Sequence, residues 1–262
     1  PTTAPPTVPL PDPTAPILAL PAGRLVPLAD VSPDFFRDRS GGGCIAENKL
    51  FCPGWVADNW DRYVDPTLQH LVLVGSAVAA GFLIAFGMAV LAHRHRWLAS
   101  PFLAGTGVLY TIPSIAFFFL LLPITGRGAL TAIIALTAFN LQIIFRNVTT
   151  GLAGVPAGVT EAARGIGMTP GQMLWRVELP LALPEIIAGL RIATVSTVAL
   201  ATLAVFANGG GLGTEIVVGA NITFKTGIIV AGSIAILMAI LFDGVLLLIG
   251  RLLSPWQRAA LA

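Results

Sequence analysis

Residues 157–180 read AGVTEAARGIGMTPGQMLWRVELP, a polar and charged stretch between long apolar runs. Thr169 and Gln172 have the spacing of a capping box, which predicts a short helix over about 170–177. Another short helix is expected just before it, over about 156–166. A membrane protein has little use for such an insert unless a soluble protein binds it. The stretch therefore predicts a docking element outside the bilayer, with membrane-spanning helices on both sides.

The composition of the whole chain is that of a membrane protein. Hydrophobic residues make up 55% of the 262 residues and charged residues only 11%, which is outside the usual range for a soluble domain. A helix needs about 20 apolar residues to cross the hydrocarbon core of a bilayer. The stretches that satisfy this requirement are 71–92, 97–125, 128–145, 192–213 and 226–242. The sequence thus predicts an all-α, polytopic membrane protein with about five spans.

The helix boundaries follow from the charges, prolines and glycines. The first membrane helix is expected over about 67–92, and the second begins near Pro101. Pro113 should kink or break this second run, because proline removes a backbone hydrogen bond and clashes with the preceding turn. The other expected elements are helices over about 128–145, 184–206 and 226–249, a Gly-rich break at 208–213 and a short amphipathic helix at 214–221.

The distribution of basic residues predicts the orientation in the membrane. Basic residues concentrate in cytoplasmic loops. One side would carry Arg94, Arg96, Arg146, Arg164, Arg176, Arg251 and Arg258, and the other Arg127 and Lys225. Five helices then place the N-terminus outside, and both the insert and the C-terminus in the cytoplasm. These bases lie at helix ends and form no basic, aromatic face, so no nucleic acid is expected as a partner.

The expected regions are a Pro-rich extracytoplasmic tail (1–29), a polar extracytoplasmic segment (30–66), a membrane domain (67–255) that contains the cytoplasmic loop 156–180, and a cytoplasmic tail (256–262). The dense prolines of the tail favour extended polyproline structure. The chain begins at Pro1 without a signal-peptide pattern. A trimmed or renumbered start and a lost upstream segment both stay open.

The two cysteines, Cys44 and Cys52, both lie in the expected extracytoplasmic segment. A disulfide can persist in that compartment and would close a short loop. Two free thiols are the alternative. Because the chain has no other cysteine, we favour the disulfide.

Polar groups inside the apolar runs are candidates for a translocation path, because such groups are costly in lipid and tend to face a cavity. They are Ser114, Asn140, Gln142, Thr194, Ser196, Thr197 and Thr202. Hydrogen bonds between helices are the alternative role for each. Asp243 is the one acid well inside an apolar run, and an antiparallel arrangement would put Arg191 at a similar depth. We hypothesise an ion pair between them. Otherwise Asp243 would reach cytoplasmic water near Arg251, and neither residue is expected to bind substrate.

The sequence lacks the motifs of an ATP-hydrolysing or metal-dependent enzyme. The Gly-rich run at 209–213 has no following Lys-Ser/Thr and comes after a membrane helix, so it does not match a phosphate-binding loop. His70, His93 and His95 fall at the expected membrane boundaries and are predicted to be interfacial residues and not metal ligands. An intramembrane enzyme is therefore disfavoured.

The insert resembles the EAA–G–I-x-LP signature of the permease subunits of ABC importers, in which it forms the cytoplasmic helix that docks on the ATPase. Val177 replaces the isoleucine of that signature. By this resemblance, the residues that couple to the ATPase are Glu161, Ala162, Ala163, Gly167, Val177, Leu179 and Pro180. The small Ala162 and Ala163 would let a partner approach closely. Pro180 and Pro184 should end the insert stiffly, so that a push on it reaches the fourth span.

Further short matches extend the resemblance over about 67–255. They are Thr111-Ile112-Pro113-Ser114, Arg146-Asn147 followed by Thr150-Gly151-Leu152, and Gly210 with Leu212-Gly213. In these motifs the chain resembles the permeases of glycine betaine, choline and carnitine importers. The Pro-rich tail and the Cys44–Cys52 segment are additions to the core of that family. Methionine-type and other amino-acid importers share the coupling motif and remain an alternative, as does a membrane scaffold that holds an ATPase without transport.

The resemblance implies the MetI-like permease fold and a multi-pass position in the bacterial inner membrane. It implies four kinds of partner: an ABC ATPase subunit, a second permease subunit that is identical or homologous, an extracytoplasmic substrate-binding protein, and the lipid bilayer. ATP and Mg would be bound by the ATPase, and this chain would hold no cofactor and be no enzyme itself. No aromatic cage for a quaternary ammonium is concentrated in the spans, so selectivity is expected in the receptor.

Overall fold

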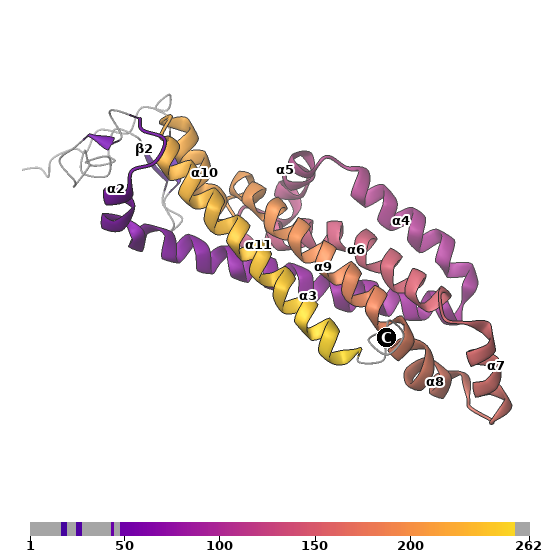
Figure 1. The fold of residues 1–262 in the computed structure, drawn as a ribbon. Helices are drawn as coiled ribbons and strands as arrows, with labels where there is room; N and C mark the ends of the chain where they lie inside the picture. The colour runs from indigo at the N-terminus through magenta and orange to yellow at the C-terminus, as the bar shows by residue number, and fades with distance from the viewer. Residues whose placement is uncertain (1–16, 20–24, 28–42, 45–47, 255–262) are drawn as a thin grey trace, which may run out of the picture.

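Long helices packed side by side form the body of the protein (Figure 1). The computed structural model describes residues 17–19, 25–27, 43–44 and 48–254. The long helices are α3 (Val64–Arg94), α6 (Ala129–Ala153), α9 (Leu179–Ala201) and α11 (Lys225–Leu253). Apart from a two-stranded antiparallel hairpin of β1 (Ile17–Ala19) and β2 (Leu25–Pro27), the elements of the described residues are helical. The expected all-α class is confirmed.

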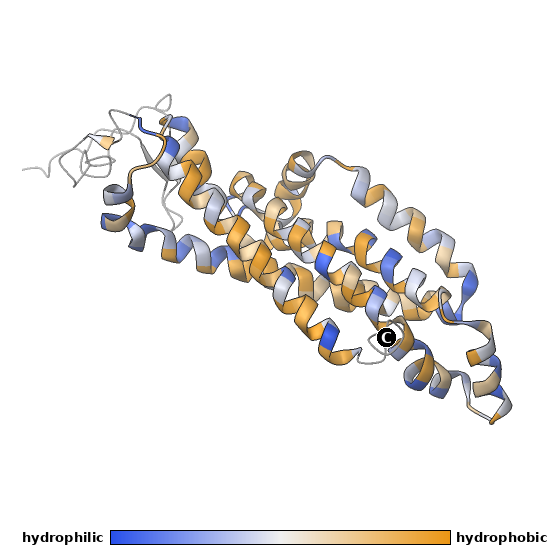
Figure 2. Ribbon diagram, viewed as in Figure 1, coloured by the Kyte–Doolittle hydropathy of each residue, from blue (hydrophilic) through white to orange (hydrophobic). Residues whose placement is uncertain are grey.

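Hydropathy and length agree with a membrane-spanning bundle. The helical runs long and apolar enough to cross a bilayer are Trp60–Arg94, Ala129–Ala153, Pro170–Ala207 and Lys225–Leu253. A bent pair, 96–111 with 114–125, makes the number of candidate spans up to five. Figure 2 shows apolar residues along the long helices and more hydrophilic residues toward the two ends of the bundle. The predicted count of about five spans is thus matched when the bent pair counts as one.

The second span is broken at proline, as expected. α4 (Ala99–Thr111) follows the short η4 (Arg96–Leu98), and α5 (Ser114–Thr125) follows the break at an angle of 99°. Ile112 has extended backbone (ψ 127°) because the residue before a proline avoids the helical region. Pro113 thereby turns the chain sharply and does not merely kink it.

Two predicted boundaries are wrong. The third span does not end at Arg146 but continues as α6 to Ala153, because the exposed Arg146 side chain is compatible with a helix surface. The fourth span does not begin near Pro184, which lies inside α9. Here α8 (Pro170–Met173), the π-helical η5 (Leu174–Glu178) and α9 form one continuous helical run. Pro180 has no backbone N–H with which to donate an α-helical hydrogen bond, and the π turn lies just before it.

Small residues allow the spans to approach closely, as is common between membrane helices. A Cβ at Gly81 of α3 would lie 2.7 Å from the Cβ of Asn140 of α6, and Gly189 of α9 similarly faces Asn147 of α6. Buried alanines and phenylalanines of α3, α5, α6 and α9 also pack together in one apolar cluster. The side chains of α6 therefore lie directly against the backbones of α3 and α9 at these glycines.

At the end of the bundle opposite α7 and α8, the segment before α3 packs on α10 (Leu212–Asn221) and on the start of α11. It contains α2 (Pro53–Asp58) and η3 (Trp60–Tyr63), and Cys44 and Cys52 are joined by a disulfide. The ring of Trp55 packs edge-on against Phe224 with centroids 4.7 Å apart. The predicted Pro-rich tail and C-terminal tail lie largely outside the described residues.

Candidate coupling surface and intramembrane polar groups

The insert forms a two-helix hairpin that projects from one end of the bundle (Figure 1). α7 (Ala157–Gly165) is followed by a turn and then by α8. Gly167 has φ +84°, a conformation that glycine adopts without strain. The capping box is present: Gln172 N–H donates to Thr169 Oγ1 at 3.3 Å, and Thr169 N–H donates to Gln172 Oε1 at 3.0 Å. The local sequence signals therefore fix the turn.

The signature residues divide into an outer and an inner group. Glu161, Ala162 and Gly167 are exposed, together with Ile166, which is 76% exposed. We call these four residues the coupling surface. The inner group comprises the buried Ala163 and Leu179 and the half-buried Val177 and Pro180. Ala163 is only 5% exposed, and its backbone carbonyl accepts from Met168 N–H. That Ala163 admits a partner stays a prediction.

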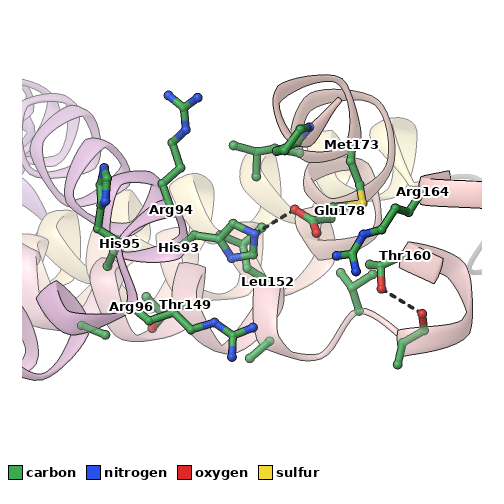
Figure 3. Close-up of a pocket in the computed structure, with 17 residues that line it drawn as sticks. His93, Arg94, His95, Arg96, Thr149, Leu152, Thr160, Arg164, Met173 and Glu178 are labelled. Atoms are coloured by element: carbon green, nitrogen blue, oxygen red, sulfur yellow. Dashed lines mark hydrogen bonds and ion pairs between the residues drawn. The ribbon is translucent and has the colours of Figure 1, made fainter. Parts of the chain in front are cut away.

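A cavity of about 1100 Å³ lies between the hairpin and the ends of α3 and α6. Its lining is rich in cationic side chains, with Arg94, Arg96 and Arg164 at its walls. Figure 3 shows His93 directed across this cavity toward Glu178. The arginine charges make this end of the bundle strongly basic, in keeping with a surface at the membrane–water boundary.

His93 and Glu178 form a contact that sequence reasoning missed. Nε2 of His93 lies 2.9 Å from Oε2 of Glu178, which is only 5% exposed. His93 lies in the last turn of α3 and Glu178 ends the π turn before α9, so the contact ties the hairpin to the first span. The sequence held one signal of this contact: the acidic Glu178 stands immediately before Leu179-Pro180, at a position that otherwise suits an apolar residue.

Glu178→Ala should destabilise the hairpin relative to the bundle. Loss of a buried hydrogen-bonded carboxylate costs roughly 1–3 kcal/mol, so the thermal midpoint of the purified permease should fall by several degrees. Glu185→Ala, which removes an exposed acid from the same helix, is the matched control. Equal midpoints for the two variants would contradict a stabilising role for the His93–Glu178 contact.

Most polar residues proposed for the path are engaged within the bundle. The Thr197 hydroxyl donates to Asn140 Oδ1 at 2.8 Å, and both residues are 1% exposed. Thr106 donates to Gln142 Oε1 at 2.5 Å. Thr194 and Thr202 donate to the backbone carbonyls of Leu190 and Ala199, four and three residues earlier in the chain. Ser114 and Ser196 are half-buried. Each of the five bonded residues thus has a hydrogen bond between or within helices, although the buried Nδ2 of Asn140 has no partner among the described residues.

The far end of the bundle contains a second cavity of about 640 Å³, lined in part by Arg127 and by the Gly-rich turn after η6 (Thr202–Ala207). Gln69 Oε1 accepts from Gly211 N–H at 3.1 Å, which holds this turn against α3. His70 was expected at the membrane interface, but it is fully buried and its Nε2 lies 3.1 Å from the carbonyl oxygen of Val198. The reason is that the Gly-rich turn folds back over the start of α3, where Gly211 lies beside the His70 ring.

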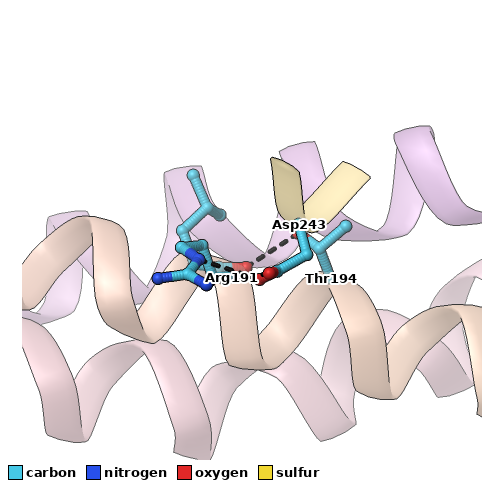
Figure 4. Close-up of polar contacts among 4 residues, drawn as sticks. Arg191, Thr194 and Asp243 are labelled. Carbon is cyan, nitrogen blue, oxygen red and sulfur yellow. Dashed lines mark hydrogen bonds and ion pairs between the residues drawn. The ribbon is translucent and has the colours of Figure 1, made fainter. Parts of the chain in front are cut away.

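Arg191 of α9 and Asp243 of α11 are paired, as Figure 4 shows. Arg191 Nε donates to Asp243 Oδ1 and Nη2 donates to Oδ2, each at 2.8 Å. This two-bond geometry is the strong form of an arginine–carboxylate contact. The structure thus brings together the two residues of the hypothesised pair.

Within the described residues, no three His, Cys, Asp or Glu side chains gather in a group that could hold a metal ion. The Gly-rich turn at 209–211 packs against α3 through Gln69 and His70. Gly210 and Gly211 have φ of +78° and +84°, so their role here is conformational.

Comparison with known proteins places these features in a family. Residues 77–259 match the family described as binding-protein-dependent transport system inner membrane component. The osmoprotectant import permease protein OsmW of Salmonella typhimurium is 39% identical over 207 residues, which cover 77% of this chain and 96% of the relative. The choline transport system permease protein OpuBB of Bacillus subtilis is 37% identical, covering 77% and 93%. The glycine betaine/carnitine/choline permease protein OpuCB of the same organism is 35% identical, with the same coverage.

Solved structures share the fold. An inward-facing structure of the MetNI methionine ABC transporter superposes with a TM-score of 0.65 at 24% identity, covering 76% of this chain and 97% of that one. An amino acid ABC transporter structure gives a TM-score of 0.63 at 20% identity, with 75% and 96% covered. These likenesses show that the chain shares its overall fold with the two transporters. This chain is a member of the binding-protein-dependent transport system inner membrane component family, the membrane-spanning permeases of ABC importers.

Proposed function

We propose that this permease carries compatible solutes of the glycine betaine, choline and carnitine class into the cell. The observation that supports this substrate class most strongly is the 35–39% identity, over more than nine-tenths of their length, to permeases named for osmoprotectants and choline. The likeness to the methionine and amino acid transporters is below 25% identity and concerns the fold alone. Compatible solutes are therefore the preferred cargo.

The coupling surface is where an ATPase subunit would dock. Glu161 offers a charge, Ile166 an exposed apolar anchor, and Ala162 and Gly167 leave room for a close approach. Motion of the docked ATPase would pass into α9 because α8, η5 and α9 are continuous. The His93–Glu178 contact would carry the same motion to α3. This pair of rigid links gives the insert the mechanical role of a lever.

The remaining partners follow from this assignment. The hairpin end of the bundle would face the cytoplasm and the α2–α10 end the outside, in a bacterial inner membrane. A second permease subunit would complete the solute path, and an extracytoplasmic binding protein would deliver the solute. ATP and Mg would be bound and used by the ATPase, so hydrolysis would take place on a partner and not on this chain.

The test is ATP turnover by the complete complex in lipid nanodiscs with its receptor, in the presence of glycine betaine, choline, carnitine or methionine. Stimulation by a quaternary ammonium solute is the expected result. Stimulation by methionine alone would keep the importer and reject the compatible-solute assignment. If no ATPase accompanies the permease from native membranes, the proposed role of the coupling surface is wrong.

A further inference from the structure

The Arg191–Asp243 pair lies deep in the spans. At about 1.5 Å per residue, Asp243 is about 15 Å from the Leu253 end of α11 and about 27 Å from the Lys225 end. A hydrocarbon layer of about 30 Å centred on this helix would place Asp243 about 8 Å inside its nearer boundary. An aspartate side chain is too short to span that distance, so in such a layer the carboxylate would lie at the depth of the lipid tails.

The pair is nevertheless incompletely covered by protein. The side chains of Arg191 and Asp243 are 31% and 36% exposed, although each is held by two hydrogen bonds to the other. A second contact, between Gly250 of α11 and Ile187 of α9, closes the seam one to two turns further along. The α9–α11 seam therefore holds the two charged groups together, and the rest of the described chain leaves about a third of each side chain uncovered.

Hydrocarbon is a poor surrounding for this arrangement. Charged side chains within membrane spans almost always face the bundle interior or a water-filled cavity, because a charge at the centre of a span costs roughly 2.5–3.5 kcal/mol even on insertion scales. The mutual hydrogen bonds reduce this cost but leave the outer N–H groups of Arg191 without lipid partners. The α9 residue one turn from Arg191 on the same side is Val195, which is also exposed, so the seam has an accessible surface beside the charges.

We infer that the α9–α11 seam at Arg191 and Asp243 faces water and forms part of the wall of the solute path. This inference rests on the proposed transport function. It replaces several residues selected from the sequence, since Asn140 and Thr197 are bonded to each other in the core. Because the two opposite charges of this wall are paired with each other, they attract water into the path but do not bind a zwitterionic or cationic solute tightly.

Thiol labelling in the complete complex tests this placement. Cys44 and Cys52 are bonded to each other, so one introduced cysteine supplies a distinct reactive thiol. Val195→Cys reports on the seam and leaves the ion pair intact. The matched control is Leu241→Cys, which lies two residues from Asp243 on the other flank of α11 and is more exposed, at 64% against 38% for Val195. The probe is a membrane-impermeant methanethiosulfonate that carries a trimethylammonium group.

We expect the Val195→Cys thiol to react at least about tenfold faster than the Leu241→Cys thiol, because only a hydrated thiol ionises readily to the reactive thiolate. Equal, slow reaction at both positions would overturn the inference. The unlabelled variants are also assayed for solute-stimulated ATP turnover. If solute stimulates ATP turnover normally but the Val195→Cys thiol is labelled slowly, the seam is not part of the path wall, and the proposed transport function stands. A fast thiol without solute stimulation in the unmodified complex would reject the proposed substrates and keep the hydrated seam.

Discussion

Ala162→Trp is expected to release the ATPase subunit from the permease while the bundle stays folded. Ala162 is exposed on α7, and its small side chain leaves space in which a docked partner can lie close to the helix. An indole there would separate the two surfaces. Because a few central residues dominate most interfaces, co-purification of the ATPase should fall at least about tenfold. The measurement is the ratio of ATPase to permease after affinity purification, with ATP turnover as a second readout.

Two controls separate docking from folding. Ala220→Trp makes the same change at an exposed position on α10, at the opposite end of the bundle, and should leave the ratio unchanged. Ala163→Trp places the indole at a buried position of the hairpin, which is 5% exposed, and should lower the thermal midpoint as well as the ratio. If Ala162→Trp retained a full complement of ATPase, the coupling surface defined here would be wrong.

Gly213→Ala should prevent the α9–α10 connection from forming its native packing. A Cβ at this position would overlap the backbone carbonyl of Thr202, and a backbone atom cannot move aside as the tip of a flexible side chain can. Overpacking costs about 1–3 kcal/mol and occasionally more, and a clash with the backbone puts this change at the upper end of that range. The thermal midpoint should fall by at least about 5 °C, and the yield of monodisperse permease should drop.

The control for this variant is Gly75→Ala in α3. A Cβ at Gly75 meets no atom within 4 Å, and alanine is favoured over glycine in a helix interior. Its midpoint should therefore equal or slightly exceed that of the unmodified protein. A stable, monodisperse Gly213→Ala permease would show that the tight turn between η6 and α10 is not required.

Features that depend on local sequence were predictable. Pro113 breaks the second span because the constraint it imposes acts on its own turn and on Ile112. The capping box at Thr169 and Gln172 formed as expected because both partners lie within one helical turn. The end of α6 was missed, because an arginine on a helix surface looks the same in sequence as an arginine that ends a span.

The candidate site was predicted only in part. The motif identified the insert, but not which of two adjacent alanines faces outward, since this depends on how α7 lies against η5 and the ends of the spans. The burial of His70 and the contact of His93 with Glu178 gave no strong local signal, because the residues that meet are 128 and 85 positions apart in the chain. The bond between Asn140 and Thr197 likewise spans 57 positions.

The sequence alone determined that this chain is a helical membrane protein with about five spans and a polar hairpin between the third and fourth, because hydropathy, proline and capping act over a few residues. Only the tertiary structure decided that the hairpin helix continues without a break into α9, that Ala162 is exposed while Ala163 is buried, and that the Arg191–Asp243 pair is left partly uncovered. These properties depend on the relative rotation and depth of helices distant in the chain. Packing between helices sets both, and no single segment encodes it.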